Sequence, residues 1–442
     1  MDITKLKEIL KDSGVAGAGG AGFPTYAKMS EKAEYVILNC AECEPLLRVH
    51  RQIIATYAEE IMKALSLVCE VLGAKEFIVA VKGAYKNAVD AVNRVLPDHE
   101  KGRLHLLKEI YPAGDEVILV YDTIKRVVPA GGLPLDVGAA VINVETALNI
   151  YRAVFEGKSV THKYITVTGE VKNPKTVLAP IGTSFSDLIA LCGGKTTEDT
   201  AIIHGGPMTG RLTDESGTVT KTSNAIIVLP KNHHIVGTRT QKVTISVTRA
   251  MGTCCQCRTC TDLCSRNLLN HPIDPAAFMR CISSGNTDVP ALVNTLYCSG
   301  CGLCEMYSCP QGLSPAALIG IYKSKLRKNG LKPDPLPAPS DAKEERDGRL
   351  VPMSRLISRL DIVKYDHDAP LDETEIKTAK VKISLAQSIG APPVVAVKKG
   401  DTVKVGDVIA AAAENALSLP IHSSVNGTVT DVTEKSVTVK LN

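Results

Sequence analysis

Eight cysteines between residues 254 and 309 have the type and spacing of metal ligands. The first four, in the pattern C-x2-C-x2-C-x3-C, are Cys254, Cys257, Cys260 and Cys264. The second four, in the pattern C-x2-C-x2-C-x4-C-P, are Cys298, Cys301, Cys304 and Cys309. Three thiolates at positions i, i+3 and i+6 can hold three corners of a [4Fe–4S] cube, and each run then needs a fourth ligand from elsewhere. We therefore expect two iron–sulfur clusters in this segment.

The spacing resembles that of bacterial dicluster ferredoxins, in which the last cysteine of each run binds the other cluster. The resemblance assigns Cys309 to the cluster of the first run and Cys264 to the cluster of the second. Structural zinc is the competing interpretation, but zinc sites usually take ligands in CxxC pairs, whereas here they come in threes. Two departures from the ferredoxin pattern are Ser265, where proline is usual, and one extra residue before Cys309.

The remaining six of the fourteen cysteines carry weaker signals. Cys255 and Cys281 lie near the two runs and are expected to be packing residues, with a redox role as the alternative. Cys40 and Cys43 form a lone CxxC, which indicates little without a partner motif. Cys69 and Cys192 stand in apolar surroundings and are expected in the core. Without an export signal, fourteen cysteines indicate thiols and metal ligands in a reducing compartment.

A glycine-rich stretch, GAGGAGFPTYAK, spans residues 17–28. Glycines lack a side chain, so backbone N–H groups at Gly17, Gly19 and Gly20 can approach a phosphate or a flat ring. A dinucleotide-binding fingerprint needs a strand before the loop, but the preceding residues look helical, and the Gly-Lys-Ser/Thr of a Walker loop is absent. Taken alone, the stretch is equally compatible with a flexible turn.

Three further segments carry polar groups that suit a nucleotide. They are NCAECEP (39–45), YPAGDE (111–116) and NVET (143–146), and their candidate binding residues are Asn39, Glu42, Glu44, Tyr111, Gly114, Asp115, Glu116, Asn143 and Thr146. Acidic groups near a glycine loop suit hydrogen bonds to ribityl or ribose hydroxyls, and Lys28 adds a positive charge. Each acid taken singly is as compatible with solvated surface.

The order G-x-G-G-A-G-F-P-T, N-x-x-E-x-E-P, Y-x-x-G-[ED]-E and N-V-E-T resembles the flavin-binding subunit of respiratory complex I and, more closely, the C subunit of Rnf electron-transport complexes. The resemblance implies that FMN is held by Gly17, Gly19, Gly20, Lys28, Asn39, Gly114, Asn143 and Thr146. It implies that Phe23, Glu44 and Glu116 face NADH and serve catalysis. Ala18 and Ile142 depart from complex I, which has Arg and Asn there.

The elements that must position these residues divide the chain into several domains. Residues 1–160 alternate strand and helix signals, with strands expected at 35–39 and 77–83, and form an α/β domain for FMN and NADH. Residues 161–240 are rich in β-branched residues and resemble the β-grasp SLBB domain, with a helix capped by Ser184 and Asp187. Residues 241–325 form a dicluster ferredoxin-like α domain. The fold class is thus multidomain α/β and α+β.

The C-terminal part is expected to be a linker at 326–372 and a barrel at 373–442. The linker combines proline and charge without periodicity, and the barrel alternates strands and turns. The barrel resembles the barrel-sandwich hybrid of lipoyl and biotinyl carriers, but a carrier needs a lysine at a hairpin tip, and none occurs between Lys404 and Lys435. A structural or docking role is therefore expected.

Composition excludes several classes of function. Aromatic residues make up 4% of the 442 residues with no Trp, which argues against platforms for single-stranded nucleic acid. The net charge of +4 is scattered, and two oxidised clusters of about −2 each would bring it near zero. No apolar run reaches 18 residues, so no membrane span is expected. The N-terminus also lacks the features of a signal peptide.

The position of the barrel after the cysteine runs, and the stretch CCQCRTCTDLCSRNLLNHPIDP, resemble the cobalamin reductases of propanediol-utilisation microcompartments. The resemblance implies NADH as donor, FMN and two [4Fe–4S] clusters as carriers, and the cobalt of cobalamin as acceptor, serving a B12-dependent diol dehydratase. It implies a cytoplasmic location within a bacterial microcompartment. Implied partners are a corrinoid, a corrinoid enzyme or adenosyltransferase, and shell proteins. Two alternatives are an Rnf-type subunit docking on membrane partners and a non-enzymatic electron-transfer adapter without a nucleotide.

Overall fold

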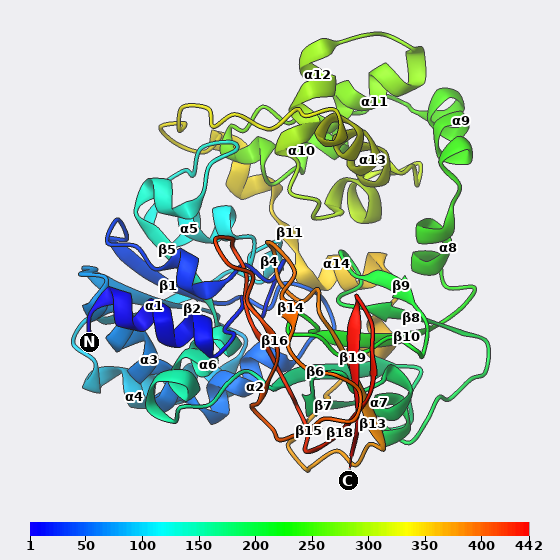
Figure 1. Cartoon of the computed structure of the whole chain (residues 1–442). Coiled ribbons are helices and arrows are strands. Elements are labelled where there is room, and N and C mark those ends of the chain that lie inside the picture. Colours follow the sequence, from blue (N-terminus) through cyan, green and yellow to red (C-terminus); the bar gives the residue numbers. More distant parts are fainter. Residues whose placement is uncertain (442) are drawn as a thin grey trace.

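The structure is a computed structural model, and it describes residues 1–441. Figure 1 shows an α/β layer built from the N-terminal third, a β-rich body beside it and a group of helices above both. The C-terminal strands return to lie against the N-terminal layer and the β-rich body (Figure 1). No helix among the described residues is long and apolar enough to cross a membrane.

A four-stranded parallel sheet, in the order β3-β2-β1-β5, forms the centre of the N-terminal part. Its strands are β1 (Tyr35–Cys40), β2 (Glu76–Lys82), β3 (Gly102–Leu107) and β5 (Ala139–Asn143). Its helices are α1 (Ile3–Asp12), α2 (Val49–Thr56), α3 (Ala58–Val71), α4 (Lys86–Val95), α5 (Glu116–Ile124) and α6 (Val144–Phe155). Both expected strands are present, and the residues before the glycine loop are helical.

The sheet buries both faces, as parallel sheets do. Along β1, Val36 and Leu38 pack on the face covered by α3 and α6, while Ile37 packs on the face covered by α5. Asn39 of β1 pairs in register with Asn143 of β5 at the carboxyl ends of these two strands. Ligands of open parallel sheets bind at this edge, so the two asparagines mark where a site can form.

A six-stranded mixed sheet, in the order β12-β7-β6-β10-β8-β9, forms the next part. Its elements are β6 (His162–Gly169), β7 (Lys175–Pro180), α7 (Phe185–Leu191), β8 (Thr200–His204), β9 (Arg211–Thr213), β10 (Ala225–Pro230), α8 (His234–Thr240) and β12 (Leu371–Asp372). Ser184 caps α7, because its hydroxyl accepts a hydrogen bond from the backbone N–H of Asp187 at 3.1 Å. The predicted capped helix is confirmed.

The cysteine-rich part consists of helices and loops. The helices are α9 (Val243–Thr253), α10 (Thr259–Asp262), α11 (Pro275–Ser284), α12 (Val289–Val293) and α13 (Pro315–Lys328). Its small core contains Phe278, Leu318 and Ile319, all nearly or fully buried. The cysteines of the two runs stand in or next to short helical turns and in the loops between them.

The prediction of a linker at 326–372 is wrong from Glu344 onward. A 3₁₀ helix spans Glu344–Arg349, β11 (Val351–Pro352) pairs with β4 (Ile110–Tyr111), and α14 (Met353–Arg359) follows. Leu356 and Leu360 are fully buried against the six-stranded sheet and the loop before α2. The helix α14 forms although residues 326–349 before it are rich in proline and charge. A short helix is stabilised when the apolar residues of only one of its faces are buried.

The C-terminal part contains two small antiparallel sheets, in the orders β13-β19-β18-β15 and β14-β16-β17. Their strands are β13 (Lys380–Ser384), β14 (Val394–Val395), β15 (Thr402–Val403), β16 (Val408–Ala411), β17 (Ile421–His422), β18 (Gly427–Val432) and β19 (Ser436–Leu441). Its apolar residues join the same core as α1 and α6. This part is therefore attached to the N-terminal layer by buried packing.

Three polar contacts fix the C-terminal part to the segment around the glycine loop. The backbone N–H of Ile389 donates to the carbonyl of Gly22 at 3.1 Å. The ammonium group of Lys221, from the second part of the chain, donates to the carbonyls of Gly14 at 2.7 Å and Pro420 at 3.1 Å. The loop therefore lies where three parts of the chain meet.

Candidate functional site

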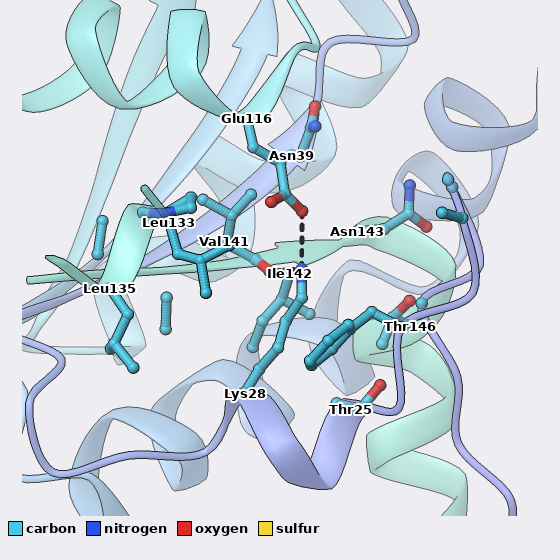
Figure 2. Close-up of a pocket in the computed structure, with 18 of the residues that line it drawn as sticks. Thr25, Lys28, Asn39, Glu116, Leu133, Leu135, Val141, Ile142, Asn143 and Thr146 are labelled. Atoms are coloured by element: carbon cyan, nitrogen blue, oxygen red, sulfur yellow. Dashed lines mark hydrogen bonds and ion pairs between the residues drawn. The ribbon is translucent and has the colours of Figure 1, made fainter. Parts of the chain in front are cut away.

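A pocket of about 380 Å³ lies between the glycine loop and the carboxyl ends of β1 and β5. We call it the glycine-loop pocket. Ten of the predicted binding residues line it, namely Gly17, Gly19, Gly20, Phe23, Lys28, Asn39, Gly114, Glu116, Asn143 and Thr146. Figure 2 shows Lys28 rising from the short helix after the loop toward Glu116, with Asn39, Asn143 and Thr146 around the same space.

The glycine loop is closed on itself and held against α6. The N–H of Gly17 donates to the carbonyl of Phe23 at 2.9 Å, and the N–H of Ala18 donates to the hydroxyl of Thr146 at 2.9 Å. A Cβ at Gly19 would collide with the side-chain amide of Asn143. A Cβ at Gly20 would meet nothing within 4 Å and would face the open pocket. Gly19 is needed for packing, whereas Gly20 leaves room for a ligand.

The polar side chains of the pocket are held by short contacts. The Lys28 ammonium group lies 2.7 Å from a Glu116 carboxylate oxygen and 3.2 Å from the Val141 carbonyl. Asn39 donates to the Gly114 carbonyl at 2.9 Å. The Lys28 and Glu116 side chains are 25% and 44% exposed. Because solvent reaches both, a ligand can exchange this ion pair for contacts of its own at little cost.

Asn143 joins the pocket to a buried histidine that the sequence motifs did not indicate. Its side-chain oxygen accepts from the N–H of Glu145 at 2.9 Å and caps α6, while its amide nitrogen lies 3.0 Å from Nε2 of His50. Burial lowers the pKa of His50 to about 4, so the imidazole is neutral and Nε2 accepts from the Asn143 amide. His50 therefore positions Asn143.

Other residues of the pocket wall were also missed. Leu133, Pro134 and Leu135 come from the short helix before β5, and Val141 and Ile142 come from β5 itself. The stretch AGGLPLD, a glycine–proline turn directly before a strand, was the available signal for this wall. These residues give the pocket an apolar face opposite the glycine loop.

Two predicted acidic residues are not in the pocket. Glu42 is 4% exposed, and it accepts from Nε of Arg51 at 2.6 Å and from the N–H of His50 at 2.8 Å. Burial alone would raise the pKa of Glu42, but the charge and hydrogen bonds of Arg51 lower it. The backbone of Glu42 has φ +39°, which turns the chain sharply after β1 and directs the segment away from the pocket. Glu42 does not line the glycine-loop pocket, and its cofactor contact stays a prediction.

Glu44 lies against a loop of the six-stranded sheet. Its carboxylate accepts from the N–H groups of Met208 and Thr209, both at 2.9 Å. Burial raises its pKa. Its side chain fills the space beside Gly206, where a Cβ would collide with it. Glu44 thus joins two domains and does not line the glycine-loop pocket, and its role toward the nicotinamide nucleotide stays a prediction.

Tyr111 and Asp115 also lie outside the pocket, and both contact the cysteine-rich part. The Tyr111 hydroxyl donates to the Cys301 carbonyl at 2.6 Å. Asp115 caps α5 by accepting from the N–H of Val117 at 3.0 Å, and both of its oxygens accept from Arg266 at 2.8 and 2.9 Å. Tyr111 and Asp115 thus join the pocket domain to the cysteine loops, and their FMN contacts stay predictions.

The cysteines of the two runs are grouped across the runs. Cys254, Cys257, Cys260 and Cys309 line one small cavity, together with the exposed Cys255. Burial, followed by the charges of Cys309 and Cys257, raises the pKa of the Cys260 thiol to about 12. Cys309 therefore lies beside the first run although it follows the second in sequence.

Cys264 lies beside the second run although it belongs to the first run in sequence. Burial, followed by the charges of Cys301 and Cys298, raises the pKa of its thiol to about 12. Burial, and then Cys298, Cys301 and Cys264, raise the pKa of Cys304. No three His, Cys, Asp or Glu side chains within residues 1–441 share a point suited to a single metal ion. Each thiolate of a [4Fe–4S] cluster binds a different iron, so the four thiolates need not converge on one point.

The remaining cysteines are separate from these two groups. Cys69 and Cys192 are fully buried in the core, as expected, and Cys281 is buried beside α12. Burial raises the pKa of Cys40, and it raises that of Cys43 to about 12. Neither thiol lines the cavity of the first group, and neither is among the charges that act on Cys264 or Cys304.

Four family models match successive parts of the chain. The Nuo51 FMN-binding domain matches residues 10–152, the SLBB domain 164–212, the 4Fe-4S dicluster domain 253–314 and the RnfC barrel sandwich hybrid domain 363–441. The predicted fold class is confirmed, and so are FMN and iron–sulfur clusters as cofactors. The glycine-loop pocket lies in the FMN-binding domain, and the grouped cysteines lie in the dicluster domain.

The residues of the pocket fit FMN. The volume of about 380 Å³ lies in the usual range for small-molecule sites. Phe23, Val141 and Leu135 provide apolar surface for a flat ring, and Lys28, Asn39 and Thr146 provide polar groups for its tail. Gly20 leaves open space at the loop. The cysteine groups fit iron–sulfur clusters, because thiolates are the ligands these clusters take.

Curated relatives match over almost the whole chain. The cobalamin reductase PduS of Citrobacter freundii is 39% identical over 440 residues, covering 99% of this chain and 97% of that protein. PduS of Salmonella typhimurium is 39% identical over 439 residues, covering 98% and 96%. The C subunit of the Na(+)-translocating ferredoxin:NAD(+) oxidoreductase complex of Acetobacterium woodii is 34% identical over 215 residues, 48% of each chain. At the identity and coverage of the two reductases, the chain belongs to the PduS cobalamin reductase family.

Proposed function

We propose that this protein is an NADH-dependent cobalamin reductase that carries FMN and two [4Fe–4S] clusters. The observation that supports it best is the direct attachment of the pocket domain to a cysteine loop, through Tyr111 and Cys301 and through Asp115 and Arg266. A protein that moves electrons between two cofactor sites needs such a fixed contact. Full-length similarity to two cobalamin reductases supports cobalamin as the acceptor.

In this proposal the glycine loop, Lys28, Asn39, Gly114, Asn143 and Thr146 hold FMN. FMN held there would supply the conversion of a hydride from NADH into single electrons. Phe23 and Glu116 are the candidates that face the nicotinamide nucleotide, since both line the open pocket. Lys28 orients Glu116 by their ion pair, and Leu133 and Leu135 provide an apolar wall. Glu44 is left out, because its carboxylate is engaged elsewhere.

The proposed clusters follow the spatial grouping of the thiols. Cys254, Cys257, Cys260 and Cys309 hold one, and Cys264, Cys298, Cys301 and Cys304 hold the other. The second group lies beside the contact with Tyr111, which makes it the group next to the pocket domain. A corrinoid or a corrinoid-carrying enzyme is the proposed partner, and the cytoplasmic interior of a microcompartment is the proposed location.

Two alternatives are less well supported. The similarity to the Rnf-type subunit extends over only 48% of the chain. A role docking on membrane partners therefore leaves about half of the sequence unexplained. An adapter that binds clusters without a nucleotide leaves the glycine-loop pocket without a purpose.

Anaerobic addition of NADH to the purified protein tests the proposal. We expect the flavin absorbance to bleach and cob(III)alamin to be reduced. The Cys301→Ala variant should still bleach but lose most of the cobalamin reduction, and Cys281→Ala is the matched control outside both groups. Absence of bleaching in the flavin-loaded protein would favour the adapter. A Cys301→Ala variant that retains the full rate of cobalamin reduction would show that the clusters serve another acceptor.

A further inference from the structure

A second hollow beside the cysteine loops shares no lining residue with the glycine-loop pocket. It is an open groove of about 670 Å³ between these loops and α14. One wall carries Thr259, Leu263, Tyr307, Ser308 and Pro310, and the other carries Ser354, Arg355, Ser358 and Arg359. Figure 1 shows α14 directly beneath the cysteine-rich helices. We call this hollow the α14 groove.

The first wall of the groove is built from neighbours of the cluster cysteines. Thr259 precedes Cys260, Leu263 precedes Cys264, and Ser308 and Pro310 flank Cys309. These cysteines belong to both thiol groups, so the groove runs along both. A molecule seated in it would lie close to the clusters without entering the glycine-loop pocket.

The second wall supplies positive charge. Arg359 donates to the carbonyl of Cys309 at 3.3 Å, which holds its guanidinium group beside the first thiol group. Arg355 is exposed and has no carboxylate partner among residues 1–441. The lining of the groove contains two arginines and no acidic residue. Guanidinium groups bind phosphate oxygens through pairs of N–H donors, which makes this wall suited to a phosphate ester.

Hydroxyl groups complete the lining. Thr259, Tyr307, Ser354 and Ser358 each present one to the groove or its rim, and each can donate to or accept from an amide. A partner that combines a phosphodiester with peripheral amides therefore matches the groove. The arginines also offset the negative charge of nearby clusters, which would otherwise repel an anionic molecule.

We propose that the α14 groove binds the corrinoid acceptor, with Arg355 and Arg359 holding the phosphodiester of its nucleotide tail. The proposal rests on the proposed function, because it assigns a place to the acceptor of that reaction. The groove is open to solvent, so it can take the nucleotide tail of the corrinoid while the ring extends outside it.

Equilibrium dialysis against cyanocobalamin and against cobinamide, the same ring without the nucleotide and its phosphodiester, tests the assignment. We expect Arg355→Gln to weaken cobalamin binding about tenfold, since one charge-assisted contact is lost. Arg355→Gln/Arg359→Gln should weaken it further. Cobinamide should bind wild type and variants alike. The matched control is Arg94→Gln/Arg327→Gln, which removes the same charge from exposed positions outside the groove.

Flavin and iron contents show whether each variant is folded and loaded. Because Arg359 also contacts Cys309, the single variant Arg355→Gln carries the test. If wild type and Arg355→Gln bind cobalamin equally, the α14 groove is not the corrinoid site, even where cobalamin is still reduced. An equal loss in the control pair also overturns the assignment. A wild-type protein that neither binds nor reduces cobalamin overturns the proposed function itself.

A protein partner would give a different pattern. If the arginines dock an acidic protein, Arg355→Gln leaves dialysis of free cobalamin unchanged and lowers only the rate with a corrinoid-carrying enzyme. That result rejects the small-molecule site. A rate with free cobalamin that falls in Arg355→Gln, while NADH bleaching of the flavin keeps its wild-type rate, supports the proposal.

Discussion

The hydroxyl group of Tyr111 donates a hydrogen bond of 2.6 Å to the backbone carbonyl of Cys301. Burial raises the pKa of Tyr111 far above its usual range, so the phenol remains a donor at every physiological pH. Tyr111 stands on the short strand β4, and Cys301 lies in the middle of the second cysteine run. The contact fixes the distance between the pocket domain and this run.

The Tyr111→Phe variant removes this hydrogen bond without changing the ring. We expect flavin and iron contents and the rate of NADH bleaching to stay at wild-type values, while cluster reduction slows severalfold, because an unpaired buried carbonyl destabilises the contact by about 1–3 kcal/mol. Anaerobic stopped-flow spectroscopy separates the two steps. Tyr322→Phe, in the same cysteine-rich part, is the control. Unchanged cluster reduction in Tyr111→Phe would show that the contact has no part in electron transfer.

Crossed ligation predicts which cluster each cysteine serves. In Cys264→Ala we expect the cluster of the 298–304 run to be lost and the cluster of the 254–260 run to remain, because Cys264 lies beside Cys298 and Cys301. Electron paramagnetic resonance and iron analysis of the reduced protein measure this. Cys255→Ala, an exposed cysteine beside the first run, should keep both clusters. Loss of only the 254–260 cluster in Cys264→Ala would contradict the crossing.

The open position of Gly20 predicts a selective loss of flavin. Gly20→Val places a branched side chain in the pocket without a clash in the protein, so we expect the fold and iron content to persist while FMN binding falls at least a hundredfold. Flavin released on denaturation is the measurement. Gly83→Val, at an exposed glycine of the same domain that also has free space around it, is the control. A Gly20→Val variant with full flavin content would show that the glycine loop does not bind FMN.

The buried Lys221 predicts a dependence of stability on pH. Burial lowers its pKa from 10.5 to about 7, and its neighbour His422, whose pKa burial lowers to about 4, stays neutral above pH 7. Between pH 7 and 10.5 the unfolded chain holds a proton on Lys221 that the folded chain has released. The free energy of unfolding therefore rises with pH in this window, by at most about 1.4 kcal/mol per pH unit.

In Lys221→Met this contribution is absent. We expect the thermal midpoint of wild type to rise relative to that of the variant as the pH increases from 7 to 10. Lys377→Met, at an exposed lysine, should follow wild type. Parallel curves for wild type and Lys221→Met would mean that Lys221 keeps its proton in the folded state.

Sequence motifs predicted the segments of the site better than the direction of each side chain. Asn39 and Asn143 could be placed because both end strands of one parallel sheet, where side chains converge. Glu42 and Glu44 stand in the same motif, but the backbone turn at Glu42 directs them to Arg51 and to the 206–209 loop. The partners of Tyr111 and Asp115 lie about 150 to 190 residues away, and no local pattern reveals such contacts.

The fold was likewise predictable where its signals are local and not where distant segments pack together. Strands 35–39 and 77–83 and the capped helix after Ser184 follow from periodicity and capping, which are local. The attachment of residues 350–365 was missed, because α14 has only seven residues and its buried face becomes apparent only against β4 and the six-stranded sheet. Short elements packed at a junction carry too few residues for a periodic signal.

Two links join the segment of the glycine loop to residues synthesised long after it: Lys221 bridges the carbonyls of Gly14 and Pro420, and Ile389 donates to Gly22. The glycine loop therefore reaches its final environment only after residues 389 and 420 have left the ribosome. A ribosome stalled before residue 389 carries a chain in which the loop lacks this support, and flavin retention is then expected to follow the synthesis of the C-terminal part.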